Sequence, residues 1–148
     1  MGVLVVVSDV LRHKGHTVIT VDPSVDVQRL VNLLTEQRVG AAVVSSDGVQ
    51  VEGIVSERDV VVALASHGAA ALDLTVWDIC SRDVALTSPG ESVDVVMSTM
   101  TERRFRHLPV VVAGELRGLV SIGDVVKARV SELEVERGAL ASYITGTR

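Results

Sequence analysis

The sequence predicts a mixed α/β (α+β) fold made of two copies of one βαββα unit, and three observations carry this prediction. Residues 23–38 align without a gap with residues 89–104, which lie 66 positions later. Both copies then continue with the same order of short apolar segments and turns. Hydrophobic residues make up 47% of the 148 residues but aromatic residues only 2%, so the core must be aliphatic, and its valine-rich segments favour strands. Each unit would bury little surface alone, so we expect the two to pack into one compact domain.

The first helix of each copy is predicted from its apolar spacing. Apolar residues recur at i, i+3, i+4 and i+7, which is one face of an amphipathic helix. They are Val27, Leu30, Val31 and Leu34 in the first copy, and Val93, Val96, Met97 and Met100 in the second. Asp22-Pro23 and Ser88-Pro89 place an N-cap residue before a proline suited to the first helical turn. We therefore expect both helices to begin at these prolines.

Strands and a second helix follow in each copy. Apolar segments predict strands, the intervening Gly-containing segments predict turns, and the second helix opens at a serine. The strands are expected at 41–44 and 53–56, then at 108–112 and 118–121, and the helices open at Ser56 and Ser121.

The chain is accordingly divided into three parts. Repeat 1 covers residues 8–66, repeat 2 covers residues 76–130, and a C-terminal helix and tail cover residues 131–148. The linker between the repeats contains Gly68, which is expected to end a helix.

Three motifs resemble those of the CBS domain pair. They are Gly-Ile-Val-Ser-Glu-Arg-Asp (53–59), Arg-His-Leu-Pro-Val-Val (106–111) and Gly-Leu-Val-Ser-Ile-Gly-Asp (118–124). The pair is the regulatory module of inosine monophosphate dehydrogenase and of the AMP-activated kinase γ subunit, and the chain resembles small bacterial proteins made only of such a pair. The resemblance implies two CBS repeats related by a pseudo-twofold axis and association into disk-like dimers. It also implies clefts that bind an adenine nucleotide, for which AMP is the leading candidate and ATP, ADP and NAD are alternatives.

Two Ser-x-x-Asp motifs are the first candidate binding residues. Ser56 with Asp59, and Ser121 with Asp124, each fit a capping box at a helix N-terminus. The resemblance implies instead that the aspartate binds both ribose hydroxyls, while the serine hydroxyl and the helix N-terminus face phosphate. The serine can serve in both roles.

Cationic residues are the second group of candidates. The resemblance implies that Arg106 and His107, just before Leu108-Pro109, contact phosphate, with Pro109 part of the binding motif. Repeat 1 has Gly40-Ala41 in their place, so we expect the two sites to be unequal.

Two further candidates stay open. Arg58, whose counterpart in repeat 2 is Gly123, either compensates for the missing cations of repeat 1 or forms a surface ion pair. Lys14-Gly15-His16 either lines the same cleft or forms a flexible loop.

Composition and motifs disfavour several other classes of protein. A net charge of −5 and few aromatic residues argue against nucleic-acid binding. The single cysteine, Cys80, excludes an internal disulfide and fits a reducing compartment. The apolar run at residues 3–7 is too short for a membrane helix and lacks the flank of a signal peptide, so we expect a cytoplasmic protein without membrane contact. The histidines lack metal-ligand spacing, and no nucleophile, base and oxyanion site can be assembled.

The leading hypothesis is a regulatory module that does no catalysis and passes nucleotide occupancy to an unknown target protein. The alternatives are a purely structural dimerisation module without a physiological ligand, and a nucleotide-hydrolysing enzyme. A homodimer is expected from an a/d stripe near the C-terminus, unless that helix packs back on its own chain. The stripe consists of Val126, Val130, Leu133, Arg137, Leu140 and Ile144.

Overall fold

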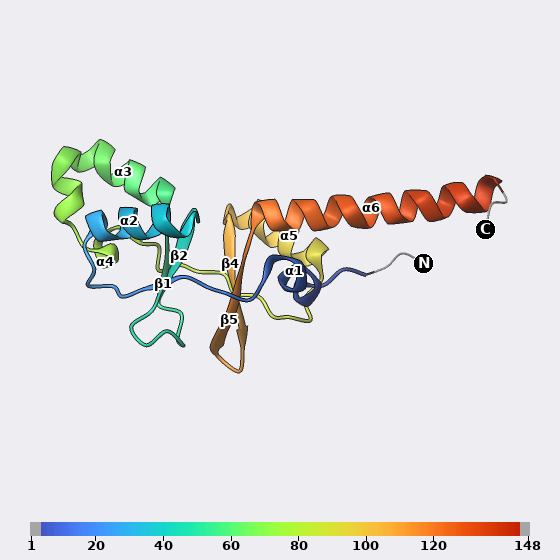
Figure 1. Ribbon diagram of the computed structural model, residues 1–148, viewed down its shortest axis with the longest axis horizontal. Coiled ribbons are helices and arrows are strands. Elements are labelled where there is room, and N and C mark those ends of the chain that lie inside the picture. The colour runs from blue at the N-terminus through green and yellow to red at the C-terminus, as the bar shows by residue number, and fades with distance from the viewer. Residues whose placement is uncertain (1–3, 146–148) are drawn as a thin grey trace.

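The computed structural model describes residues 4–145, and for residues 141–145 the backbone alone. Two lobes lie side by side, and a long helix extends outward from one of them (Figure 1). The helices are α1 (Val7–Lys14), α2 (Val27–Gln37), α3 (Glu57–His67), α4 (Val76–Ile79), α5 (Val93–Arg103) and α6 (Ile122–Thr145), with a 3-10 helix at Gly68–Asp73. The strands are β1 (Thr20–Val21), β2 (Ala41–Val44), β3 (Gly53–Ser56), β4 (His107–Val112) and β5 (Glu115–Ser121).

The sheets confirm the mixed α+β prediction but are not identical. In the first lobe β1 pairs parallel with β2, and β2 pairs antiparallel with β3. In the second lobe β4 and β5 form a hairpin whose turn residues, Ala113 and Gly114, both have positive φ. The strand expected before α5 is reduced to one parallel bridge between Thr87 and Val110.

Pro109 accounts for this shortened strand. In repeat 1 the amide of Val43 donates to the carbonyl of Ile19 at 3.0 Å, which continues the β1–β2 ladder. Pro109 occupies the position equivalent to Val43, and proline has no N–H to donate. The corresponding ladder bond therefore cannot form in repeat 2.

The expected start of α2 and α5 at the prolines is wrong. The helices begin four residues later, with Asp26 and Ser92 as N-caps that accept hydrogen bonds from the amides of Arg29 (2.8 Å) and Val95 (3.2 Å). Pro23 and Pro89 instead lie in turns closed by backbone hydrogen bonds, from Val25 to Asp22 and from Glu91 to Ser88. A fixed φ suits position i+1 of such a turn as well as a first helical turn, so the proline alone does not determine the helix start.

Each lobe packs against the short helix that precedes the other repeat in the sequence, so the two lobes exchange these helices. Residues Val7, Val10 and Leu11 of α1 are buried in the core of repeat 2, against α5, β4 and β5. Val76 of α4 is buried in the core of repeat 1. Figure 1 shows α1 beside α5 and α6, although the chain next enters the other lobe. Each core is therefore completed by a segment that lies outside its own βαββα unit.

The second helix of repeat 2 and the C-terminal helix form one continuous helix, α6. Residues 133–140 are all exposed, so this part of the helix does not pack back on the described part of its own chain, while the side chain of Ile144 lies outside the described residues. Among the side chains of α6 that the structure describes, Glu132 is the last buried one; it accepts a hydrogen bond from the amide of Val5 at 3.0 Å and pairs with Arg129. Among the described residues, no helix combines the length and apolarity that crossing a membrane requires.

Candidate functional site

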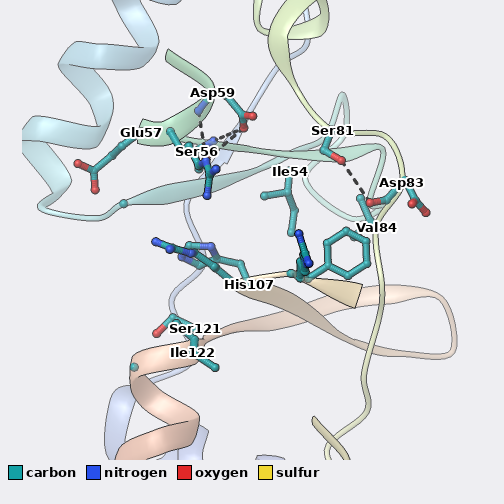
Figure 2. A pocket seen from close by; sticks show the side chains of 16 residues that line it. Ile54, Ser56, Glu57, Asp59, Ser81, Asp83, Val84, His107, Ser121 and Ile122 are labelled. Carbon is teal, nitrogen blue, oxygen red and sulfur yellow. Dashed lines mark hydrogen bonds between the residues drawn. The ribbon is translucent and has the colours of Figure 1, made fainter. Parts of the chain in front are cut away.

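A cavity of about 620 Å³ lies between the two repeats. Repeat 1 contributes the N-terminal end of α3, and repeat 2 contributes the segment before β4 and the start of α6. Figure 2 shows Ser56 and Asp59 on one side and His107 and Ser121 on the other. The lining residues are Gly40, Ile54, Ser56, Glu57, Arg58, Asp59, Ser81, Asp83, Val84, Arg104, Phe105, Arg106, His107, Ser121, Ile122 and Gly123.

Two helix N-termini border this cavity in equivalent ways. The amide of Glu57 donates to the carbonyl of Gly40 at 2.9 Å, and the amide of Ile122 donates to that of Arg106 at 2.8 Å. Each bond joins the first residue of α3 or α6 to the residue directly before the first strand of the same antiparallel pair, β2 or β4. The positive ends of two helix dipoles therefore lie at one cavity, which favours an anionic ligand.

Asp59 forms the capping box that its motif allows. Its Oδ2 accepts from the amide of Ser56 at 2.8 Å, and the Ser56 hydroxyl lies 3.4 Å from the amide of Asp59. Burial raises the pKa of Asp59 above its ordinary value, against the opposing effect of the Ser56 hydrogen bonds and of Arg58. Among the described residues Asp59 accepts hydrogen bonds only from Ser56, so its carboxylate retains accepting capacity toward the cavity.

Asp124 has the same cap but an additional partner. Its Oδ2 accepts from the amide and the hydroxyl of Ser121, both at 2.9 Å, and from Lys14 Nζ at 2.6 Å. Burial opposes ionisation of Asp124, but the hydrogen bonds from Lys14 and Ser121 outweigh it and lower its pKa. Asp124 does not line the cavity.

Cationic side chains gather on the repeat 2 side of the cavity. Arg104, Arg106 and His107 line it there, and Arg58 lines it from repeat 1. Within the part of the chain whose side chains are described, none of these three arginines forms an ion pair. Burial lowers the pKa of His107, and the charges of Lys14 and Arg106 lower it further, against the effect of Asp124.

The cavity unites six of the eight residues singled out from the sequence. They are Ser56, Arg58, Asp59, Arg106, His107 and Ser121. Pro109 is buried in β4, where it pairs with Leu119, and it does not line the cavity.

The apolar wall of the cavity was not anticipated. Ile54, Val84, Phe105 and Ile122 supply it. Ile54 and Ile122 belong to motifs already quoted, but nothing in the sequence marked them as lining residues, and Phe105 directly precedes the motif that begins at Arg106. Val84 comes from the linker after α4, which no motif marked.

The fold and the cleft define a class of protein: a tandem of two βαββα repeats that exchange a helix and enclose a polar cavity between two helix N-termini. Residues 7–66 and 76–131 each match the CBS domain. The chain therefore belongs to the CBS domain family and carries two CBS domains in tandem.

Known proteins similar to this chain include plant and bacterial members of the family. The mitochondrial CBS domain-containing protein CBSX3 of Arabidopsis thaliana is 35% identical over 150 residues, which span 95% of this chain and 72% of the relative. The crystal structure of the CBS-domain protein ATU1752 from Agrobacterium tumefaciens is 44% identical with a TM-score of 0.78, covering 84% of this chain and 98% of that one.

A third solved structure shares the fold at lower identity. The CBS domain pair of protein MJ0100, in complex with 5′-methylthioadenosine and S-adenosyl-L-methionine, is 21% identical with a TM-score of 0.77. The match covers 87% of this chain and 98% of that one.

Proposed function

We propose that this protein is a regulatory module that binds an adenine nucleotide, AMP first, in the cavity between its CBS domains and does no catalysis. The observation that carries the proposal is the meeting of Asp59 with Arg106 and His107 at one cavity. A carboxylate suits the vicinal diol of a ribose, and an arginine suits a phosphate, because both pairings give charge-assisted hydrogen bonds.

The shape and lining of the cavity support a ligand of nucleotide size. Its volume of about 620 Å³ lies within the ~300–1,000 Å³ of typical small-molecule sites. Ile54, Val84 and Phe105 offer an apolar wall to a base, while the polar groups surround the sugar and phosphate. The adenosine-containing ligands bound to the MJ0100 pair favour adenine over other bases.

Binding in this cavity would bridge both repeats. Its walls come from α3 on one side and from β4 and α6 on the other, so occupancy favours one arrangement of the lobes over others. A signal to a target protein requires such a difference in affinity between two states. A structural dimerisation module would not need a cavity lined by arginines that form no ion pair with any described residue, and a nucleotide hydrolase would need a positioned nucleophile and base.

Calorimetry with AMP and adenosine tests the proposal. Replacing Arg106 by Ala should weaken AMP at least about tenfold, because a hydrogen bond to a charged group contributes ~1.5–3 kcal/mol. Adenosine should change by less than about twofold, because it has no phosphate for the guanidinium. Arg117→Ala is the matched control, since Arg117 pairs with Glu115 on β5 and lies outside the cavity. Equal losses for AMP and adenosine would show that Arg106 shapes the cavity wall instead.

We also propose a homodimer and a cytoplasmic location. The exposed apolar residues of α6 support the dimer. The location rests on the sequence alone, and one relative is named as mitochondrial.

A further inference from the structure

We infer that Lys14 occupies the carboxylate of Asp124, so that each chain binds one nucleotide, in the cavity beside Asp59. The inference rests on the proposed function. Lys14 is the last residue of α1, and its Nζ donates to Asp124 Oδ2 at 2.6 Å and to the carbonyl of Leu119 at 2.7 Å. Two acceptors fix the ammonium in place, and the side chains of Lys14 and Asp124 are only 32% and 26% exposed.

The internal repeat shows why a lysine pairs with the capping aspartate in one repeat only. Ile54 and Leu119 are equivalent positions, two residues before the capping serines. The carbonyl of Ile54 accepts from the backbone amide of Ser81 at 2.9 Å, within a β-bridge, whereas the carbonyl of Leu119 accepts from the ammonium of Lys14. The same acceptor is thus satisfied by backbone in one repeat and by a cation in the other.

The length of the preceding helix causes the difference. Helix α4 ends at Ile79, so the chain after it lies along β3 as backbone, whereas α1 continues to Lys14. Aligning the capping acids Asp9 and Asp78 places Asp83 at the position of Lys14. Asp83 carries a negative charge, so it cannot pair with Asp59 as Lys14 pairs with Asp124.

The two carboxylates therefore differ in what a ribose must displace. At Asp124 the sugar hydroxyls would have to replace an ammonium, which is the stronger partner for a carboxylate because it is charged. At Asp59 they meet a carboxylate whose hydrogen bonds, among the described residues, come only from Ser56. A nucleotide consequently selects the Asp59 cleft.

Calorimetric titration with AMP measures the number of sites. The wild-type chain should bind one AMP, and Lys14→Met should bind two, with the second site lost again in Lys14→Met/Asp124→Ala. Lys127→Met is the matched control, because Lys127 is the other lysine of the chain and is exposed on α6. It should bind one AMP with wild-type affinity. Two AMP per wild-type chain, or one per folded Lys14→Met chain, would overturn the inference.

Single aspartate variants keep the inference testable if Lys14→Met does not fold. Asp59→Ala should bind AMP at least tenfold more weakly than wild type. Asp124→Ala should stay within about twofold of the wild-type affinity, because the Asp124 carboxylate of the wild-type chain already pairs with Lys14. A tenfold loss in Asp124→Ala would overturn the assignment. A wild-type chain that binds no AMP, ADP, ATP or NAD refutes the proposed function, and the inference with it, whereas two sites refute only the inference.

Discussion

Asp59 and Asp78 occupy the same position of a capping box but ionise in different surroundings. Burial raises the pKa of Asp59, while the hydrogen bonds of Thr75 lower the pKa of the exposed Asp78. Between its ordinary and its folded-state pKa, Asp59 binds more protons in the folded protein than in the unfolded one. The stability that Asp59 contributes therefore falls as the pH rises through that interval, starting at 3.8, and stays lower at pH 7.

Asp59→Asn should consequently stabilise the unliganded protein at pH 7 and weaken AMP binding. The amide oxygen of Asn can still accept from the Ser56 backbone, but the desolvated charge is gone. Urea unfolding at pH 7 and near pH 4 should show a stability gain that shrinks on acidification. AMP affinity should fall about tenfold or more, because charge-assisted bonds to the ribose are lost.

Asp78→Asn is the matched control for this variant. It removes a carboxylate whose pKa is lowered, so stability should decrease at pH 7 and approach that of wild type as the pH falls below 3.8. Effects of the same sign at both positions would mean that the desolvation of Asp59 does not govern its stability contribution.

His107 should make the binding of phosphorylated ligands pH-dependent. Burial and the charge of Lys14 hold its pKa below 6.5, so its imidazole is neutral in the unliganded protein at pH 7. A phosphate beside it favours the imidazolium and raises that pKa, and binding therefore takes up a proton. The contribution of His107 to AMP affinity should therefore increase as the pH falls, and it should continue to increase below pH 6.5.

The measurement is the ratio of AMP dissociation constants for His107→Gln and wild type at pH 7.5 and 5.5. The ratio should grow by roughly tenfold on acidification, because one charge-assisted hydrogen bond contributes ~1.5 kcal/mol. Taking the ratio cancels the titration of AMP itself, whose phosphate has a second pKa of about 6. A ratio that does not change with pH would remove His107 from the phosphate site.

At the scale of elements, the sequence was informative wherever a pattern is local. The apolar stripes of α2 and α5 and the strands β2 and β3 follow from side-chain spacing, and the structure confirms them. The shortened strand at Thr87 was missed because it depends on a donor that Pro109 lacks on a neighbouring strand. The residues around Thr87 do not themselves show that the neighbouring strand lacks this N–H donor.

The candidate site was predictable to a similar degree. The capping serines and Asp59 belong to a duplicated motif, and they meet at the cavity. Lys14 could be named as a candidate but not assigned to Asp124, because the two residues are 110 positions apart. Their contact requires α1 to pack on repeat 2, and no local sequence pattern predicts that packing.

The exposed end of α6 should mediate dimer formation. Val130, Leu133 and Leu140 are 48%, 45% and 60% exposed on a helix that extends beyond both lobes (Figure 1). An isolated helical end of this length is marginal in water, and a second copy would bury its apolar stripe. Light scattering on the full chain should therefore give twice 15.7 kDa.

Deleting residues 134–148 should give a monomer, because Glu132 and its contact to Val5 are retained while the C-terminal half of the stripe is removed. Leu133→Gln/Leu140→Gln should act in the same way, whereas Val135→Gln should leave the dimer intact, since Val135 is exposed but lies off the stripe. A deletion variant that is still dimeric would show that the helix is dispensable for assembly.

At the scale of the whole molecule, the helix exchange makes the two repeats depend on each other. Val7 and Leu11 are 1% and 2% exposed in the core of repeat 2, and a Cβ on Gly118 would come within 2.9 Å of Leu11. A fragment of residues 76–148 should therefore be loosely folded, because truncating one buried Leu alone costs ~2–5 kcal/mol. Near-ultraviolet circular dichroism and amide exchange would measure the loss.

A synthetic peptide of residues 4–16 should restore order to that fragment in trans. The same peptide with Leu11→Asp should not, because a charge would enter the aliphatic core without a partner. Native-like exchange protection in the fragment without any peptide would show that repeat 2 is complete by itself.

The exchanged helices also constrain how such a chain could arise. A polypeptide with a single repeat and its preceding helix would carry a helix that reaches away from its own core, and would leave that core open. Two copies would complete each other's cores by exchanging this helix. The product would be a domain-swapped dimer with twofold symmetry. Tandem duplication then joins the partners into one chain, and only after that step can the two halves diverge. The lysine at position 14 and the aspartate at position 83 would record that divergence, in an assembly that began with identical halves.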